Sequence, residues 1–124
     1  AITGNPDMSG IFVATSAPAS GAASAVIEAG QSGKIKIAAF DADPQQVEDL
    51  KSGVYDILIA QNPYQMGYDA IMNLAKYVRG ELTDADFPED GVQHYDTFAI
   101  TRDNVESEEA RTFKYIATIS QGGY

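Results

Sequence analysis

The sequence predicts an α/β fold built on a parallel sheet. Three short apolar runs each end at polar side chains, and the segments between them are long enough to hold one helix each. The second and third runs are each followed by a proline that stands directly after Asp or Asn, which is the pattern of a capped helix start. Strands separated by helices form right-handed βαβ units, in which the strands lie parallel. We therefore expect the carboxyl ends of the strands to share one edge of the sheet.

The first strand is expected at residues 11–15 and the first helix at 18–29. The run Ile11–Ala14 is short, apolar and preceded by Gly10, as in a buried strand. The helix that follows is rich in Ala and ends before Gly30, a common residue just beyond a helix end. Its small side chains would let this helix lie close to the sheet or to a ligand.

The second and third strands are expected at residues 35–41 and 55–60, with a helix at 44–52 between them. Asp43 stands at the N-cap of that helix, and Pro and Gln follow at its first and third positions, as in a capping box. The longest helix is expected at 63–79, because apolar side chains recur along it every three or four residues.

The last third of the chain has a different character. We expect an acidic loop at 83–91, a fourth strand of the same parallel sheet at about 97–101, a short polar helix at 103–111 and a last strand at 113–119. The fourth strand is predicted because apolar and polar residues alternate there.

The composition excludes several classes of protein. With 124 residues and 44% hydrophobic side chains, the chain is the size of one domain and can bury a modest core. Its net charge of −10 argues against a nucleic-acid partner, whose phosphates bind Lys and Arg, and against an anionic membrane surface. The chain has no Cys, so it carries neither disulfides nor thiol chemistry and would tolerate an oxidising compartment.

Polar side chains follow the three predicted strands. Asp41 and Gln61 each end a strand shortly before a proline, and Thr15 and Ser16 end the first strand. Small molecules bind at the carboxyl ends of the strands in open α/β sheets. A carboxylate can accept two hydrogen bonds from vicinal hydroxyls, and an amide can donate and accept, which suits a neutral polyol. Taken singly, Asp41 could cap the following turn and Gln61 could bond to backbone; taken together, these residues favour ligand binding.

No catalysis, metal or cofactor is predicted. The four strand-end residues include neither an activated nucleophile nor a base, and His94, the single histidine, has no catalytic partner nearby in the sequence. The acidic loop at 83–91 departs from the calcium-binding pattern, because Glu89 stands where that pattern requires Gly. We expect a protein that captures a polar ligand and is not an enzyme.

Several short segments together resemble the carboxy-terminal half of type I periplasmic sugar-binding proteins, and of ribose-binding proteins in particular. The resemblance runs from the first residue to about Thr101. It rests on the order and spacing of Asp7–Ser16, Gly21-Ala22, Glu28–Gly30, Phe40-Asp41, Gly53, Ile59–Pro63 and Met66-Gly67. It implies part of a lobe of the periplasmic-binding-protein-like I type, with a three-layer α/β/α architecture and a parallel sheet.

The resemblance also implies a binding site and a division of the chain. Asp41, Gln61, Thr15 and Ser16 would contact the sugar. Ribose binders have Asn-Asp in place of Thr15-Ser16, so the resemblance implies a sugar or similar small polyol rather than ribose in particular.

The family has two lobes and roughly twice this length. Residues 1–61 and 96–124 would belong to the carboxy-terminal lobe, and residues 62–95 would cross to a missing amino-terminal lobe. The apolar stripe of the helix at 63–79 would then need a cover, either that lobe or a dimer that swaps this helix. Because the chain begins with Ala in the middle of this architecture, we expect a fragment or a processed product.

The resemblance leaves two functions open. The first is a fragment of the substrate-binding component of an ABC importer, which holds a sugar between two lobes and signals a membrane permease. Such a protein would be periplasmic, or extracellular and anchored to the membrane through a missing N-terminus. The alternative is the sugar-sensing effector domain of a transcriptional regulator of the lactose-repressor type. The acidity and the absence of Cys favour the importer, and an upstream signal peptide or helix-turn-helix would separate the two.

Overall fold

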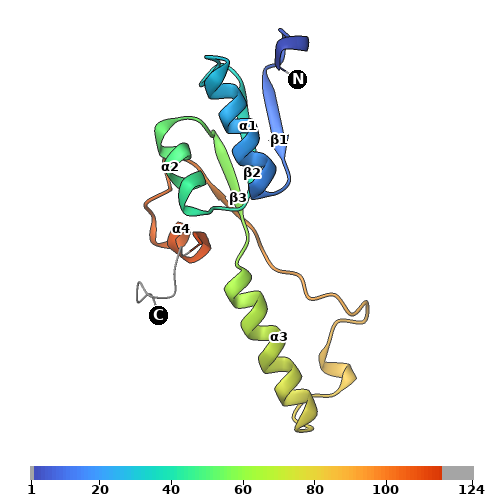
Figure 1. The fold of residues 1–124 in the computed structure, drawn as a ribbon. Coiled ribbons are helices and arrows are strands. Elements are labelled where there is room, and N and C mark those ends of the chain that lie inside the picture. Colours follow the sequence, from blue (N-terminus) through green and yellow to red (C-terminus); the bar gives the residue numbers. More distant parts are fainter. Residues whose placement is uncertain (1, 116–124) are drawn as a thin grey trace. The chain divides into compact units, whose positions relative to one another are not determined.

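A computed structural model describes residues 2–115 of the chain. In this part of the chain helices and strands alternate, and two short 3₁₀ helices, η1 (Ile2–Gly4) and η2 (Asp84–Asp86), accompany them. Figure 1 shows these elements in order: β1 (Gly10–Val13), α1 (Ser16–Glu28), β2 (Lys36–Phe40), α2 (Pro44–Ser52), β3 (Ile57–Ala60), α3 (Pro63–Val78), β4 (Phe98–Ile100) and α4 (Glu108–Phe113). The chain divides into two compact units, the first comprising residues 1–60 and 98–124 and the second residues 61–97.

The sheet of the first unit has the order β1-β2-β3-β4. β1, β2 and β3 are parallel, which confirms the predicted α/β fold. The expectation that the fourth strand is also parallel is wrong, because β4 runs antiparallel to β3. The reason lies in the path of the chain: Ala60, the last residue of β3, pairs with Phe98, the first residue of β4. Residues 61–97 thus leave the sheet at the carboxyl end of β3 and re-enter it beside that same end, so β4 must run in the opposite direction.

The helix starts agree with the local sequence signals. Asp43 caps α2, since its Oδ1 accepts a hydrogen bond from Gln46 N at 2.9 Å while Gln46 Oε1 accepts one from Asp43 N at 3.0 Å. Gln46 Nε2 also donates to the carbonyl oxygen of Phe40 at 2.9 Å, which ties α2 to the end of β2. Asn62 caps α3 through a 3.0 Å bond from Gln65 N. Each cap stabilises its helix by about 1 kcal/mol.

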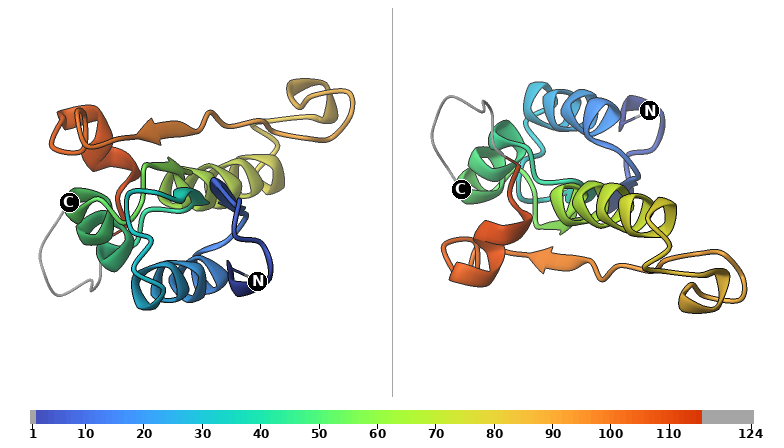
Figure 2. Two further views of the ribbon diagram at one scale, coloured as in Figure 1. Left: turned by 90° about the horizontal axis from the view of Figure 1, so that it is seen from above. Right: turned by 90° about the horizontal axis from the view of Figure 1, so that it is seen from below.

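One face of the sheet forms the core. Along the strands, side chains on this face are buried while their neighbours in sequence are not, as the period of two requires. Helices α1, α2 and α4 cover this face, and Figure 2 shows them along one side of the strands. The core side chains of the sheet are Val13, Ile37, Ala39, Leu58, Ala60 and Ile100.

The opposite face of the sheet is open in the described residues. Phe12, on the edge strand β1, is 65% exposed and contacts Phe40 of β2 edge to face, with ring centroids 6.1 Å apart. Strand register places Ala38, Ile57 and Ile59 on this same face. The described residues of the first unit therefore supply one helical layer, and none of its own helices covers the opposite face.

The second unit consists of α3 and the segment that returns along it. Of the sixteen described residues of α3, none is buried. The returning segment contacts α3 at two points: Tyr77 donates a hydrogen bond to Asp84 at 2.9 Å, and Tyr95 donates one to Asp69 at 3.1 Å. The ring of Tyr77 also lies 6.0 Å from that of Phe87. These contacts cover one side of α3.

The carboxy-terminal part of the chain differs from its prediction. A helix was expected at 103–111, but the structure has turns there and begins α4 only at Glu108. Ser107 determines this start, because its Oγ accepts a hydrogen bond from Ala110 N at 3.1 Å. The last strand, expected at 113–119, is wrong at its start, since Phe113 ends α4; residues 116–119 lie outside the described part of the chain.

Candidate ligand-binding site

Asp41 lies at the carboxyl end of β2 in an uncommon backbone conformation. Its φ of 73° makes it the single non-glycine residue with positive φ among the described residues. Asp tolerates this left-handed region better than most residues, and such conformations cluster at functional sites. The backbone nitrogen of Asp41 still donates to the carbonyl oxygen of Ile59 at 3.0 Å, so the residue remains attached to the sheet.

The Asp41 carboxylate accepts hydrogen bonds from two distant parts of the first unit. Oδ2 accepts one from the backbone nitrogen of Ser16 at 3.2 Å, and Oδ1 accepts one from the Tyr115 hydroxyl at 2.7 Å. Ser16 is the first residue of α1, so the carboxylate lies where a helix N-terminus favours negative charge. Asp43, and not Asp41, caps α2, while Asp41 bonds to the start of α1.

Thr15 and Ser16 lie at the start of α1, next to Asp41. Thr15 is the N-cap residue and has extended backbone angles, but its side chain makes no capping hydrogen bond. The Asp41 carboxylate takes the place of that cap by accepting from Ser16 N. The structure therefore brings three of the four predicted site residues to one sheet edge. Their role in binding a ligand stays a prediction.

Gln61 is the first residue of the second unit and follows β3 directly. It is partly buried, and it lines a hollow of about 130 Å³ together with Met66 of α3 and residues 93–97 of the returning segment. An amide in this hollow can both donate and accept hydrogen bonds.

Tyr115 is the neighbour of Asp41 that sequence reasoning missed. The two residues are 74 positions apart in the chain, and no local pattern connects them. Burial raises the pKa of the Tyr115 phenol above its ordinary value, and the hydrogen bond to Asp41 raises it further. The phenol therefore stays protonated and remains a donor to the carboxylate at neutral pH.

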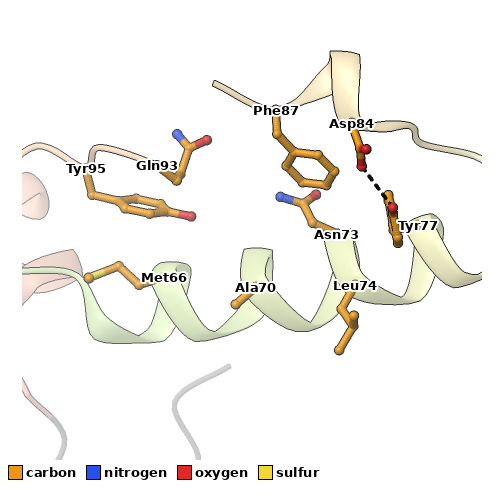
Figure 3. A pocket seen from close by; sticks show the side chains of 9 residues that line it. All are labelled: Met66, Ala70, Asn73, Leu74, Tyr77, Asp84, Phe87, Gln93 and Tyr95. Atoms are coloured by element: carbon orange, nitrogen blue, oxygen red, sulfur yellow. Dashed lines mark hydrogen bonds between the residues drawn. The ribbon is translucent and has the colours of Figure 1, made fainter. Parts of the chain in front are cut away.

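A larger hollow, of about 540 Å³, lies within the second unit between α3 and the returning segment (Figure 3). Figure 3 shows Tyr95 and Phe87 above Met66 and Ala70, and Asn73 pointing toward Phe87. Its walls are mainly aromatic and aliphatic, so it resembles a surface for packing more than a site for a polyol.

Among residues 2–115 no group of three His, Asp or Glu side chains could hold a metal ion. The side chain of His94 is 83% exposed, and its Nε2 lies 3.9 Å from Asp90. No helix within the described residues is both long and apolar enough to span a membrane.

Comparisons with solved structures identify similar proteins. An ABC transporter solute-binding protein from Agrobacterium vitis, solved with alpha-D-tagatopyranose, is 33% identical with a TM-score of 0.82, over 93% of this chain and 37% of that one. A second one from Agrobacterium vitis, bound to D-fucose, is 28% identical with a TM-score of 0.80, over 92% and 37% of the two chains. A third, from Agrobacterium radiobacter in complex with D-arabinose, is 30% identical with a TM-score of 0.76, over 92% and 37%.

These matches also define how much of such a protein is present. The chain spans 37% of the length of these three solute-binding proteins. A search of curated protein sequences found no match. The sequence profile of the periplasmic binding protein domain matches residues 1–82. The resemblance expected from the sequence is therefore confirmed, and the chain belongs to the periplasmic binding protein domain family.

Proposed function

We propose that the chain is part of the substrate-binding component of an ABC importer and binds a sugar or similar small polyol. The observation that carries this proposal is the Asp41 carboxylate, held at the carboxyl edge of the sheet by α1 and Tyr115. The similarity to solute-binding proteins with bound sugars supports the same ligand class. The role is one of binding without catalysis.

Each site residue has a distinct task in this proposal. Asp41 accepts hydrogen bonds from two sugar hydroxyls, because the two oxygens of a carboxylate together offer about four lone-pair positions. Gln61 donates to one hydroxyl and accepts from another. Thr15 and Ser16 contribute hydroxyl groups at the start of α1, where the helix N-terminus also supports the charge of Asp41.

In this proposal the two units correspond to different lobes, except that residues 61, 96 and 97 of the second unit are counted with the carboxy-terminal lobe. Residues 1–61 and 96–124 belong to the carboxy-terminal lobe, and residues 62–95 pack on an amino-terminal lobe from sequence outside these 124 residues. The apolar surface of α3 supports this division, since Ile71 is 67% and Leu74 59% exposed. Contiguous exposed apolar surface of this kind marks an interface.

Lobe closure links binding to transport. A sugar held between two lobes stabilises the closed form, because it contacts both lobes only in that form. The closed form then engages a membrane permease. This role places the protein in the periplasm or, if anchored through sequence that precedes residue 1, at the outer cell surface.

Calorimetric titration of the protein expressed from its complete gene tests the proposal. D-Tagatose, D-fucose and D-arabinose are the first ligands to use, because they are the sugars of the similar structures. We expect at least one of them to bind with 1:1 stoichiometry and to raise the melting temperature. No binding across a broad panel of monosaccharides would contradict the proposal.

Cell fractionation separates the importer from a sugar-sensing transcriptional regulator. An importer component is released with the periplasmic contents by osmotic shock. A regulator of the lactose-repressor type would remain in the cytoplasm and bind DNA in a sugar-dependent way.

A further inference from the structure

Tyr115 contacts the end of β2 with both its backbone and its side chain. Its nitrogen donates a hydrogen bond to the carbonyl oxygen of Ala42 at 3.0 Å, and its hydroxyl donates to Asp41 Oδ1 at 2.7 Å. The segment after α4 thus lies against the two residues that follow β2. One of these two, Asp41, is the residue with the left-handed backbone.

The two donors hold the carboxylate at different oxygens. Ser16 N bonds to Oδ2 and the Tyr115 hydroxyl to Oδ1, and these donors come from opposite ends of the chain. The terminal torsion of an Asp side chain is otherwise broad, so an unrestrained carboxylate rotates. A short bond between a hydroxyl and a carboxylate is among the stronger hydrogen bonds in proteins. Together the two donors restrict the carboxylate plane to one orientation.

We propose that Tyr115 is a positioning residue of the sugar site, which orients the Asp41 carboxylate for the ligand without contacting the ligand itself. This inference rests on the proposed function, since it assigns to Tyr115 a task in that same site. A carboxylate oxygen can accept two hydrogen bonds, so the Tyr115 hydroxyl and a sugar hydroxyl can share Oδ1. Holding a binding group in its productive orientation before the ligand arrives increases affinity, because less freedom is lost on binding.

The segment that carries Tyr115 is held by contacts other than the phenol hydroxyl. The ring of Phe113 stacks on that of Phe98 with centroids 5.3 Å apart. Lys114 Nζ donates to the carbonyl oxygen of Val105 at 2.6 Å. Removing only the hydroxyl, as in Tyr115→Phe, therefore leaves the segment in place and removes the hydrogen bond to Asp41.

A double-mutant cycle in the protein expressed from its complete gene tests the inference. Sugar affinity is measured by calorimetry for the wild type, Tyr115→Phe, Asp41→Asn and the double variant, with D-tagatose, D-fucose or D-arabinose, whichever binds the wild type most tightly. We expect Tyr115→Phe to raise Kd about 3- to 10-fold, as the loss of one hydrogen bond to the charged group suggests. In the Asp41→Asn background the same change should have less than about a twofold effect, because Tyr115 acts through Asp41.

Tyr55→Phe is the matched control in the same unit. Tyr55 is fully buried, and its hydroxyl has no hydrogen-bond partner among the described residues. Removing that hydroxyl breaks no hydrogen bond of the described structure, so Kd should equal that of the wild type. The melting temperature of Tyr115→Phe should fall by several degrees at most, so the variant stays folded at the temperature of the titration, which separates positioning from a loss of folding.

The outcomes distinguish this inference from the proposed function. An unchanged Kd for Tyr115→Phe, with Asp41→Asn weakened, would overturn the inference alone. A lower Kd would overturn it in favour of a phenol that competes with the sugar, and equal losses in both backgrounds would show that Tyr115 does not act through Asp41. No binding of any sugar by the wild type would overturn the proposed function and this inference with it. An Asp41→Asn variant with unchanged affinity would remove Asp41 from the site and overturn the inference while sugar binding itself stands.

Discussion

Helices α2 and α3 begin with similar local sequences and differ in what they pack against. In each case the strand is followed by a polar residue, then by the side chain that caps the helix, and then by a proline. These residues are Asp41, Asp43 and Pro44 for α2, and Gln61, Asn62 and Pro63 for α3. α2 buries Gln46, Val47 and Leu50 against the sheet, whereas none of the described residues of α3 is buried. Local signals thus start both helices equally well, and only the tertiary partner decides whether a helix joins a core.

Paired truncations of the two helices give the largest expected difference. Leu50 of α2 is fully buried and Leu74 of α3 is 59% exposed. Leu50→Ala should lower the free energy of unfolding by about 2–5 kcal/mol, because it leaves a cavity. Leu74→Ala should change it by less than about 0.5 kcal/mol. Urea unfolding of the 124-residue chain, followed by circular dichroism, measures both. Equal losses of unfolding free energy would show that α2 and α3 do not differ in how they are packed.

The two acids before α2 separate ligand binding from helix capping. In the protein expressed from its complete gene, Asp41→Ala should weaken sugar binding by ~1.5–3 kcal/mol, since a charged acceptor is lost. Asp43→Ala should lower stability by about 1 kcal/mol and leave affinity nearly unchanged, because Asp43 caps α2. Calorimetry and thermal melting of both variants provide the measurements. An Asp43→Ala variant that loses as much affinity as Asp41→Ala would assign both effects to the helix start.

The proposed first lobe should change the behaviour of α3. Ile71 is 67% exposed in the second unit. In the protein expressed from its complete gene, Ile71→Ala should lower the free energy of unfolding by about 1.5 kcal/mol, because another lobe would bury this side chain. In the 124-residue chain the same substitution should have little effect. Denaturant unfolding of the protein from the complete gene and of the 124-residue chain measures both effects. A small effect of Ile71→Ala in both proteins would argue against a lobe on this face of α3.

The smallest expected effect concerns acid stability. Burial tends to raise the pKa of Asp56, but the hydrogen bonds from Lys36 and Ile37 N outweigh it, and the pKa lies below its ordinary value. A lowered pKa stabilises the folded state above the unfolded-state pKa of about 3.9, and this contribution is lost as the pH falls through the folded-state pKa. Asp56→Asn should lower the free energy of unfolding by about 1 kcal/mol at pH 7 and flatten its decline as the pH falls below about 5.

Asp86 of the second unit is the control for this pH dependence. Its pKa is lowered by the Thr83 backbone N–H and hydroxyl at the exposed start of η2. Asp86→Asn should alter the acid decline less than Asp56→Asn does. Urea unfolding across the pH range gives both curves. A larger change for Asp86→Asn than for Asp56→Asn would show that Asp56 is not the main source of the loss of stability in acid.

The sequence by itself determined the local elements. The capped starts at Asp43 and Asn62, the three parallel strands and the proximity of Asp41 to Ser16 could all be predicted from it. The physical reason is that caps, turns and side-chain periodicity depend on residues only a few positions apart. Three parallel strands joined by helices then bring their carboxyl ends to one edge, which places the residues that follow them.

Only the tertiary structure decided the features that depend on the path of the chain. The antiparallel direction of β4 follows from the pairing of Ala60 with Phe98, and no local pattern in either strand encodes it. The hydrogen bond between Tyr115 and Asp41 joins residues 74 positions apart, and the residues next to Asp41 in the sequence do not predict it. Contacts of this length are formed by whichever segments the packed core leaves side by side, so a sequence pattern predicts the polar residue and the fold alone supplies its partner.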